Sequence, residues 1–138
     1  MTPERVDATQ RRLDEIFECH FRRLSDVHEW AETNRQSYRL DSGVREFRAG
    51  HVLISLGLER GLPELRLGAI DEPSSLRDLS LYKDLLKPAQ RGRWTLSLEQ
   101  QADFLTHNWS ALQGLLTPTA WRSTVAIIDG ELKAPEGP

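Results

Sequence analysis

The sequence is poor in cysteine and lysine, and it lacks a long apolar run. Its 138 residues include one cysteine, Cys19, which excludes an intramolecular disulfide. No stretch of about 18 apolar residues and no secretory signal pattern occurs, so we expect no membrane span and a cytoplasmic location. Lysine occurs three times against fifteen arginines, yet the net charge is −3. This acidic balance argues against nucleic acid as a partner, because phosphate binding requires concentrated positive charge.

The composition is that of a folded domain. Hydrophobic residues make up 38% and charged residues 28% of the chain, and four tryptophans are present, which argues against intrinsic disorder. A chain of this length buries roughly two-thirds of its unfolded surface. We therefore expect a single domain over residues 1–138, with residues 134–138 as a frayed tail.

The first 27 residues have the period of an amphipathic helix. Its apolar stripe recurs at spacings of three and four and consists of Leu13, Ile16, Phe17, His20, Phe21 and Leu24. Pro3 suits a first helical turn, because its missing N–H would be unbonded there. The pattern predicts one helix over residues 3–27 and a connection over residues 28–36.

Two further helices are expected after residue 70. Ser75, with Asp78 three residues later, resembles a capping signal for a helix that extends to Leu86. Ser97 and Gln100 fit a capping box for a third helix, which has a well-defined apolar face. We expect these two helices to pack on one face of a sheet.

Between the first and second helices the period changes to two, which is typical of β-strands. The alternation is clearest from Val52 to Leu58. Turn residues interrupt it at Ser42-Gly43, Ala49-Gly50 and Gly61-Leu62-Pro63. The sequence therefore predicts an α+β fold with an antiparallel meander of about four strands over residues 37–69. Residues 121–128 fit either a last strand or a helical turn.

The arginines in this strand region require an explanation in a half-buried sheet. If the first two turns have two residues each, Arg39 pairs with Glu46 on one face, and Arg45 lies at the rim of the apolar face. The same register places Arg48 and His51 together in one further row across the strands, with Arg35 nearby. These three basic residues are candidate partner contacts.

The sequence contains no recognised catalytic signature, and we expect no cofactor or metal ion. The histidines of the first helix and the strands lack a second ligand at an i, i+4 spacing, and no glycine-rich phosphate loop follows a strand. Asp103 and His107 are four residues apart on the third helix and could form a carboxylate–imidazole pair, although an ordinary surface pair is the simpler interpretation. Cys19 and His20 point about 100° apart on a helix, which argues against a thiol–imidazole pair.

Some aromatic and acidic side chains are further candidate partner contacts. Trp109 fits the core face of the third helix. Trp30 and Trp94 lie outside strong periods, so either could anchor a partner protein. Glu99 and Asp103 give the third helix an acidic surface, although Glu99 is equally explained as a charge that complements the positive helix N-terminus.

The order of elements resembles small uncharacterised bacterial α+β proteins that are similar to the immunity proteins of polymorphic toxin systems. The strand pair GVREFRAGHVLISLG, the helix SLRDLSLYKDLLK and the late helix ADFLTHNWSALQGLL carry the resemblance, which covers residues 37–116. It implies a noncatalytic protein that binds and blocks a cognate toxin, and it brings no catalytic residues. The arginine-rich strands differ from the acidic surface of many nuclease-blocking immunity proteins, which argues against a nuclease target.

Three functions are compatible with the sequence. The first is noncatalytic protein binding, with immunity-type inhibition of a toxin as its most concrete form. The second is a small enzyme or ligand-binding domain that uses Asp103, His107 or the sheet arginines. The third is an anion- or nucleic-acid-binding sheet, whose affinity would fall steeply with salt. The missing active-site constellation favours the first.

Overall fold

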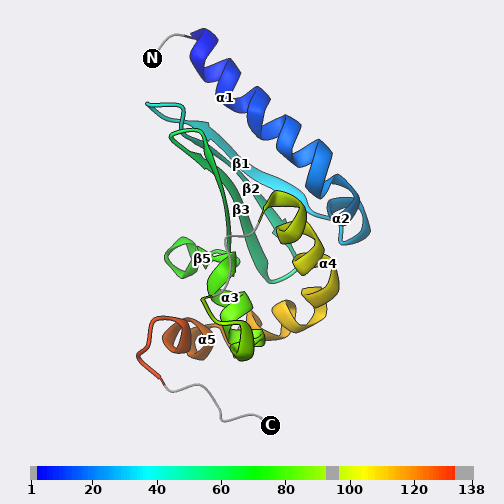
Figure 1. Ribbon diagram of the computed structural model, residues 1–138, viewed down its shortest axis with the longest axis vertical. Helices are drawn as coiled ribbons and strands as arrows, with labels where there is room; N and C mark the ends of the chain where they lie inside the picture. The colour runs from blue at the N-terminus through cyan, green and yellow to red at the C-terminus, as the bar shows by residue number, and fades with distance from the viewer. Residues whose placement is uncertain (1–2, 93–96, 133–138) are drawn as a thin grey trace.

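The computed structural model describes residues 3–92 and 97–132. Within these residues the chain is α+β, as predicted, with an N-terminal helical segment, a five-stranded antiparallel sheet and three later α-helices where two were expected (Figure 1). The strands form a meander in the order β1-β2-β3-β4-β5. In chain order the elements are α1 (Pro3–Ile16), η1 (Phe17–Phe21), α2 (Arg22–Val27), β1 (Ala31–Ser37), β2 (Gly43–Ala49), β3 (Val52–Glu59), β4 (Leu62–Ala69), η2 (Pro73–Ser75), β5 (Arg77–Asp78), α3 (Leu79–Leu86), η3 (Pro88–Gln90), α4 (Leu98–Leu115) and α5 (Trp121–Ile128).

The N-terminal helical segment is confirmed, but it is not uniformly α-helical. A π-helical turn, η1, lies between α1 and α2. Phe17 and Phe21 of this turn are both buried, and the ring centroid of Phe17 lies 4.9 Å from that of Phe47 in β2. The apolar stripe predicted from the helical period therefore packs on the sheet through this wider turn.

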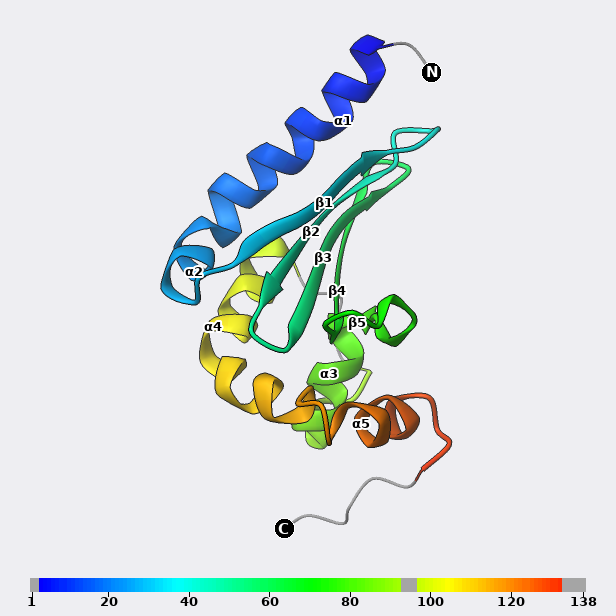
Figure 2. The ribbon, with the colours of Figure 1, turned by 180° about the vertical axis from the view of Figure 1, so that it is seen from behind.

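The helices cover one face of the sheet, which we call the inner face. Phe47, Ile54 and Leu67 are register neighbours across β2, β3 and β4, and all three are buried. Figures 1 and 2 show α1, α2 and α4 on this side of the sheet, with α3 and α5 at one end. Among the described elements, only the segment around η2 and β5 crosses the opposite, outer face, where Ser75 lies against Gly68.

The first strand lies where the sequence predicts a connection. Residues 31–37 form β1, whereas the expected strand residues from Tyr38 onward belong to the loop that leads to β2. Leu40 and Asp41 have positive φ angles of 60° and 57°, a conformation that cannot continue a strand. Most side chains of β1 are exposed, and its covered side meets charged groups, so the sequence shows no apolar alternation there.

The predicted register is wrong in two different ways. Between β2 and β3, Phe47 pairs with Ile54 where Val52 was expected, because the turn lies at Gly50-His51. This shift of two residues leaves every side chain on its expected face. Between β1 and β2, Glu46 pairs with Asn34 and not with Arg39, so the expected Arg39–Glu46 pair does not exist.

The start of α3 also differs from the prediction. Its N-cap is Asp78, whose side chain accepts a hydrogen bond from the backbone N–H of Ser80. Ser75, the expected cap, is buried, and its hydroxyl accepts from the N–H of Ala69 and donates to the carbonyl of Glu72. Ser75 thus stabilises the corner after β4, because it satisfies backbone groups that no strand partner reaches.

The last two helices are fixed by a cap and an ion pair. Ser97 and Gln100 form the capping box of α4, which confirms the prediction. Residues 121–128 form a helix, α5. Arg77 of β5 binds Asp129 after α5 through two bonds, Nε–Oδ1 at 2.8 Å and Nη2–Oδ2 at 2.7 Å. This bidentate pair connects the end of the chain to the sheet edge.

Three carboxylates in ion pairs make the stability of the fold decrease at acid pH. The hydrogen bond from Arg77 lowers the pKa of Asp129 below its usual range. Burial raises the pKa of Asp84 and of Glu32, but hydrogen bonds from basic side chains outweigh it, and the net shift of each pKa is downward. A carboxyl group with a lowered folded-state pKa contributes stability that is complete above its unfolded pKa of about 4 and is lost as the pH falls through the folded value.

We therefore expect the contribution of these three carboxyl groups to the free energy of unfolding to be constant from about pH 7 to pH 5. It should decrease as the pH falls below about 4. Urea unfolding at several pH values measures this. The variant Asp129→Asn should be less stable than wild type at neutral pH, and the difference should shrink toward about pH 2, where the wild-type carboxyl group is protonated as well. A difference that stays constant over this range would contradict the assignment.

Candidate functional site

Polar residues line up across the outer face of the sheet. One row of register neighbours crosses all five described strands and consists of Asn34, Glu46, Ser55, Arg66 and Asp78. The next row, closer to the β3–β4 turn, brings Val44, Gly57 and Glu64 together. The outer face is therefore not a second apolar layer but a surface of mixed polarity.

A β-bulge decides which charges of β1 reach this face. The pairing of β1 with β2 shifts between Glu32 and Asn34, so these residues lie on opposite faces although they are two positions apart. Asn34 lies on the outer face, where its Nδ2 donates to Glu46 Oε1 at 2.7 Å. Glu32 lies on the inner side, where its Oε1 accepts from the Nε of Arg45 at 3.0 Å.

The outer face contains a hollow of about 280 Å³, which we call the sheet hollow. Its polar side chains come from four segments of the chain: they are Tyr38, Ser42, Glu46, Ser55, Glu59, Glu64 and Arg66. Val44, Gly57 and Leu76 add apolar and backbone surface. Arg66 donates to Glu64 at 3.0 Å, so two of the three carboxylates, Glu46 and Glu59, are not balanced by an arginine of the hollow.

On the inner side, two arginines and two carboxylates form a closed network. Asp14 Oδ1 lies 2.8 Å from Nη1 of Arg35 and 3.1 Å from Nη1 of Arg45, and Glu32 Oε1 lies 2.9 and 3.0 Å from the Nε atoms of the same two arginines. The charges balance, so this cluster offers no excess positive charge for an anion. The prediction that Arg45 lies at the rim of the core is confirmed, because its side chain is 11% exposed.

Arg35, Arg48 and His51 do not form the row that the predicted register gives, and their role as partner contacts stays a prediction. Arg35 pairs with Arg45 in the register and contacts Asp14 on the inner side, whereas Arg48 is exposed between the buried neighbours Phe47 and Ala49 and therefore lies on the outer face. His51 is part of the β2–β3 turn and has no strand partner. The physical reason is the bulge in β1 together with the displaced turn, which the sequence does not reveal.

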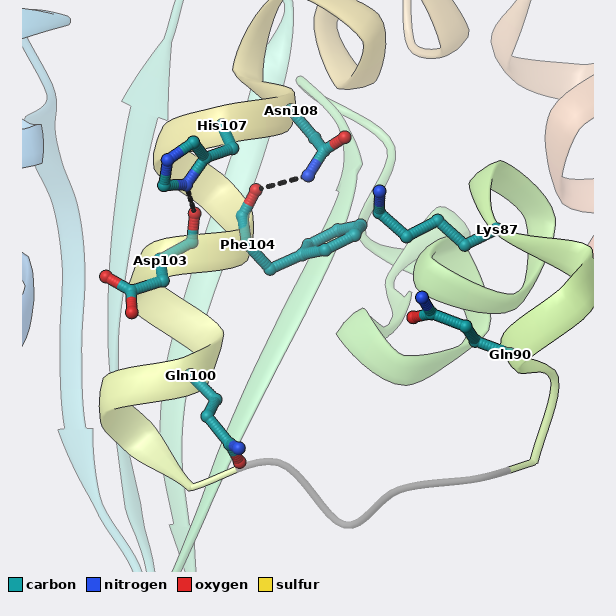
Figure 3. A pocket seen from close by; sticks show the side chains of 7 residues that line it. All are labelled: Lys87, Gln90, Gln100, Asp103, Phe104, His107 and Asn108. Carbon is teal, nitrogen blue, oxygen red and sulfur yellow. Dashed lines mark hydrogen bonds between the residues drawn. The ribbon is translucent and has the colours of Figure 1, made fainter.

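A second cavity, of about 430 Å³, lies between α4 and the segment around η3, and we call it the α4 cavity. The residues that line it are Lys87, Gln90, Gln100, Asp103, Phe104, His107 and Asn108. Figure 3 shows Phe104 and Asn108 pointing from α4 toward Lys87 and Gln90, while the Asp103 carboxylate points away from them. The cavity combines an aromatic wall with amide groups and one lysine.

Asp103 and His107 both border the α4 cavity, but their side chains do not pair. His107 Nδ1 lies 2.7 Å from the backbone carbonyl oxygen of Asp103 (Figure 3). A carbonyl oxygen only accepts, so Nδ1 carries the proton, and in the neutral ring Nε2 keeps a lone pair. The expected carboxylate–imidazole pair is therefore replaced by a bond from the imidazole to the helix backbone.

The other predicted contact residues lie in different environments. Trp30 is half-buried, with its ring centroid 5.8 Å from that of Trp109 and 5.7 Å from that of Phe47, so packing on the core accounts for it. Glu99 is exposed in the first turn of α4. Trp94 lies outside the described residues. The predicted contact residues that the structure describes thus do not share one surface.

Sequence reasoning missed the residues of the sheet hollow, although a signal for them exists. From Ile54 to Glu59 the residues that alternate with the buried apolar side chains are Ser55, Gly57 and Glu59, which are small or polar. This pattern indicates an uncovered face, but it does not reveal which residues of β2 and β4 lie beside it. Gly57 lies inside β3.

Comparisons with protein-family models, with curated proteins and with solved structures found no match. Among the described residues, no helix is long and apolar enough to cross a membrane. The same part of the chain contains no group of three or more His, Cys, Asp or Glu residues that could hold a metal ion.

Proposed function

We propose that this chain is a noncatalytic protein-binding domain that uses the outer face of its sheet, and that inhibition of a bacterial toxin is the concrete form of this role. The observation that carries the proposal is the sheet hollow on a face that the described helices leave uncovered. The resemblance of residues 37–116 to immunity proteins supports the second part of the proposal.

Exposed apolar side chains at one end of the same face support a protein as the partner. Tyr38 borders the hollow and is exposed, and Leu40 and Leu62 are 58% and 70% exposed. Tyr38 and Leu40 lie in the β1–β2 loop and Leu62 begins β4. A hydrogen bond from the N–H of Gly61 to the carbonyl of Asp41 joins that loop to the β3–β4 turn. Exposed apolar and aromatic groups beside polar ones are typical of the centre and rim of a protein interface.

Co-expression with the product of the neighbouring gene tests this proposal. We expect the two proteins to co-purify, and we expect the chain to restore growth to cells that the neighbouring product would otherwise kill. A neighbouring product that is toxic, does not bind the chain and is not neutralised by it would contradict the proposal. A variant that keeps the fold but has Tyr38→Ala and Leu62→Ala should bind more weakly, because it loses exposed contact area.

The α4 cavity supports a second candidate function, the binding of a small polar ligand. Its volume of about 430 Å³ lies in the range of ligand pockets, and the lone pair on Nε2 of His107 can accept a hydrogen bond. We expect His107→Ala to change the free energy of unfolding by less than about 0.5 kcal/mol, because the side chain is exposed. A fragment screen by NMR checks the function: ligands that shift α4 amides should lose affinity for the variant, and an unchanged affinity would contradict a role of His107.

A further inference from the structure

Gly57 of β3 leaves space at the sheet hollow where any other residue would place a side chain. Gly57 lies in register between Val44 of β2 and Glu64 of β4. A Cβ atom added at Gly57 would meet only the carbonyl oxygens of Gly43 at 3.5 Å and Glu64 at 4.0 Å, which are ordinary contacts, and its φ angle is not in the left-handed region. Neither backbone conformation nor crowding therefore requires glycine, so the space above it is available to a ligand.

The side chain of Ser55 lines this space, and its hydroxyl is available to a ligand. Ser55 is only 9% exposed and borders the hollow. Its register neighbours are engaged elsewhere, since Glu46 accepts from Asn34 and Arg66 donates to Glu64. Among the described residues no hydrogen bond to the Ser55 hydroxyl occurs. A serine hydroxyl can donate one bond and accept two, so this one can bond a ligand group that enters the hollow.

The charge of the hollow selects the kind of ligand. Glu46, Glu59 and Glu64 contribute three negative charges, and Arg66 contributes one positive charge, so the hollow has an excess of two negative charges. Each carboxylate can accept several hydrogen bonds. Val44 and Leu76 provide apolar surface for an aliphatic stem, and lysine and arginine combine such a stem with a cationic head.

We propose that the sheet hollow binds one lysine or arginine side chain of a partner protein, with the aliphatic stem over Gly57 and the cationic head between the glutamates and the Ser55 hydroxyl. This inference rests on the proposed protein-binding function and names the group that the partner supplies. The exposed Tyr38, Leu40 and Leu62 at the end of the hollow lie where the partner segment that carries the basic residue would continue.

Two kinds of variant distinguish the effect of the space in the hollow from the effect of its negative charge. Gly57→Val places a branched side chain in the hollow, and we expect its melting temperature to equal or exceed that of wild type, because the added Cβ is not crowded and valine favours a strand. The triple variant Glu46→Gln, Glu59→Gln, Glu64→Gln removes the charges and keeps the size. Gly114→Ala is the control for Gly57→Val, because an added Cβ there meets nothing within 4 Å, and Glu29→Gln, in the α2–β1 connection, is the control for the charge change.

The probes are N-acetyl-arginine amide and N-acetyl-lysine amide, with uncharged N-acetyl-norleucine amide for comparison, in an NMR titration of the full chain. We expect at least one cationic probe to shift the amides of Ser55, Gly57 and Glu64 with saturation, and the norleucine probe to leave them unchanged. The affinity should fall at least roughly tenfold in Gly57→Val and in the triple variant, and it should stay the same in both controls. No saturable shift in wild type, or equal binding to folded Gly57→Val, would overturn the inference.

A failure of the inference about the hollow can be distinguished from a failure of the proposed function. If the neighbouring gene product binds wild type and Gly57→Val with equal affinity, the domain binds protein but the hollow does not receive a basic side chain. If the cationic probe binds the hollow and the neighbouring product does not bind the chain, the site is present and the proposed toxin-inhibiting function is wrong.

Discussion

Replacement of Lys83 by methionine is expected to lower the free energy of unfolding by about 3 kcal/mol. The Lys83 side chain is 1% exposed, and its Nζ lies 2.8 Å from Oδ1 of Asp84 and donates to the carbonyl oxygen of Gln90 at 2.7 Å. Asp84 also accepts from the N–H of Gly92. Methionine keeps most of the apolar stem, so urea unfolding of this variant measures the loss of the cation. The partly buried carboxylate of Asp84 then loses its cationic partner, and the carbonyl group of Gln90 loses the Lys83 donor.

Lys87→Met is the matched control, because Lys87 is exposed beside the same segment, and we expect a change of less than about 0.5 kcal/mol. The double variant Lys83→Met, Asp84→Asn should recover part of the loss, since a neutral amide does not require a cation. Equal stability of Lys83→Met and Lys87→Met would contradict the view that this lysine holds the segment from Pro88 to Gly92 against α3.

Replacement of Arg45 by methionine is expected to lower the free energy of unfolding by about 2 kcal/mol. The guanidinium carbon of Arg45 lies 4.5 Å from the ring centroid of Phe17 and 4.9 Å from that of Phe47. The same group binds Asp14 and Glu32. It is thus partly withdrawn from water, where cation–π contacts and ion pairs are stronger than at the surface. Thermal and urea unfolding both measure the loss.

Arg35→Met distinguishes the contribution of burial to stability from that of charge, because Arg35 binds the same two carboxylates with a side chain that is 36% exposed. We expect a loss of less than about 1 kcal/mol. Arg45→Lys should fall between wild type and Arg45→Met, since an ammonium group lacks the planar fork that reaches both carboxylates. Equal losses in Arg35→Met and Arg45→Met would show that the contacts with the two phenylalanine rings contribute nothing.

The elements that the sequence predicts well are those whose covered side is apolar. The N-terminal helical segment, the strand from Val52 to Glu59 and the capping box at Ser97 all show the expected period or cap. β1 shows neither, because the inner side of this edge strand meets Asp14 and Arg45 through ion pairs. A strand that is covered by charged contacts resembles a loop in the sequence, and a bulge further removes its alternation.

The sheet hollow was harder to predict because it depends on three strands at once. The alternation in β3 indicates that Ser55 and Gly57 share the uncovered face, and this much is readable from the sequence. The neighbours Glu46 and Glu64 follow only from the exact register of β2 and β4. For β2 the error was two residues, which preserves the face but exchanges the neighbour of Ser55.

The separation of structural and binding charges follows from the two faces of the sheet. On the inner side, Arg35 and Arg45 are neutralised by carboxylates and contribute to stability. On the outer side, Glu46 and Glu59 are not paired with an arginine of the hollow, and Gly57 leaves space beside them. Substitutions on the inner side should therefore change stability, whereas those in the hollow should change binding.

The most direct test of the binding surface is the affinity of the chain for the product of its neighbouring gene, measured by calorimetry for wild type, Gly57→Val and His107→Ala. We expect wild type and His107→Ala to bind equally, and Gly57→Val to bind roughly a hundredfold more weakly while it remains folded. A partner that binds Gly57→Val as tightly as wild type, and loses affinity for His107→Ala, would contradict the outer face of the sheet as the binding surface and place it at the α4 cavity.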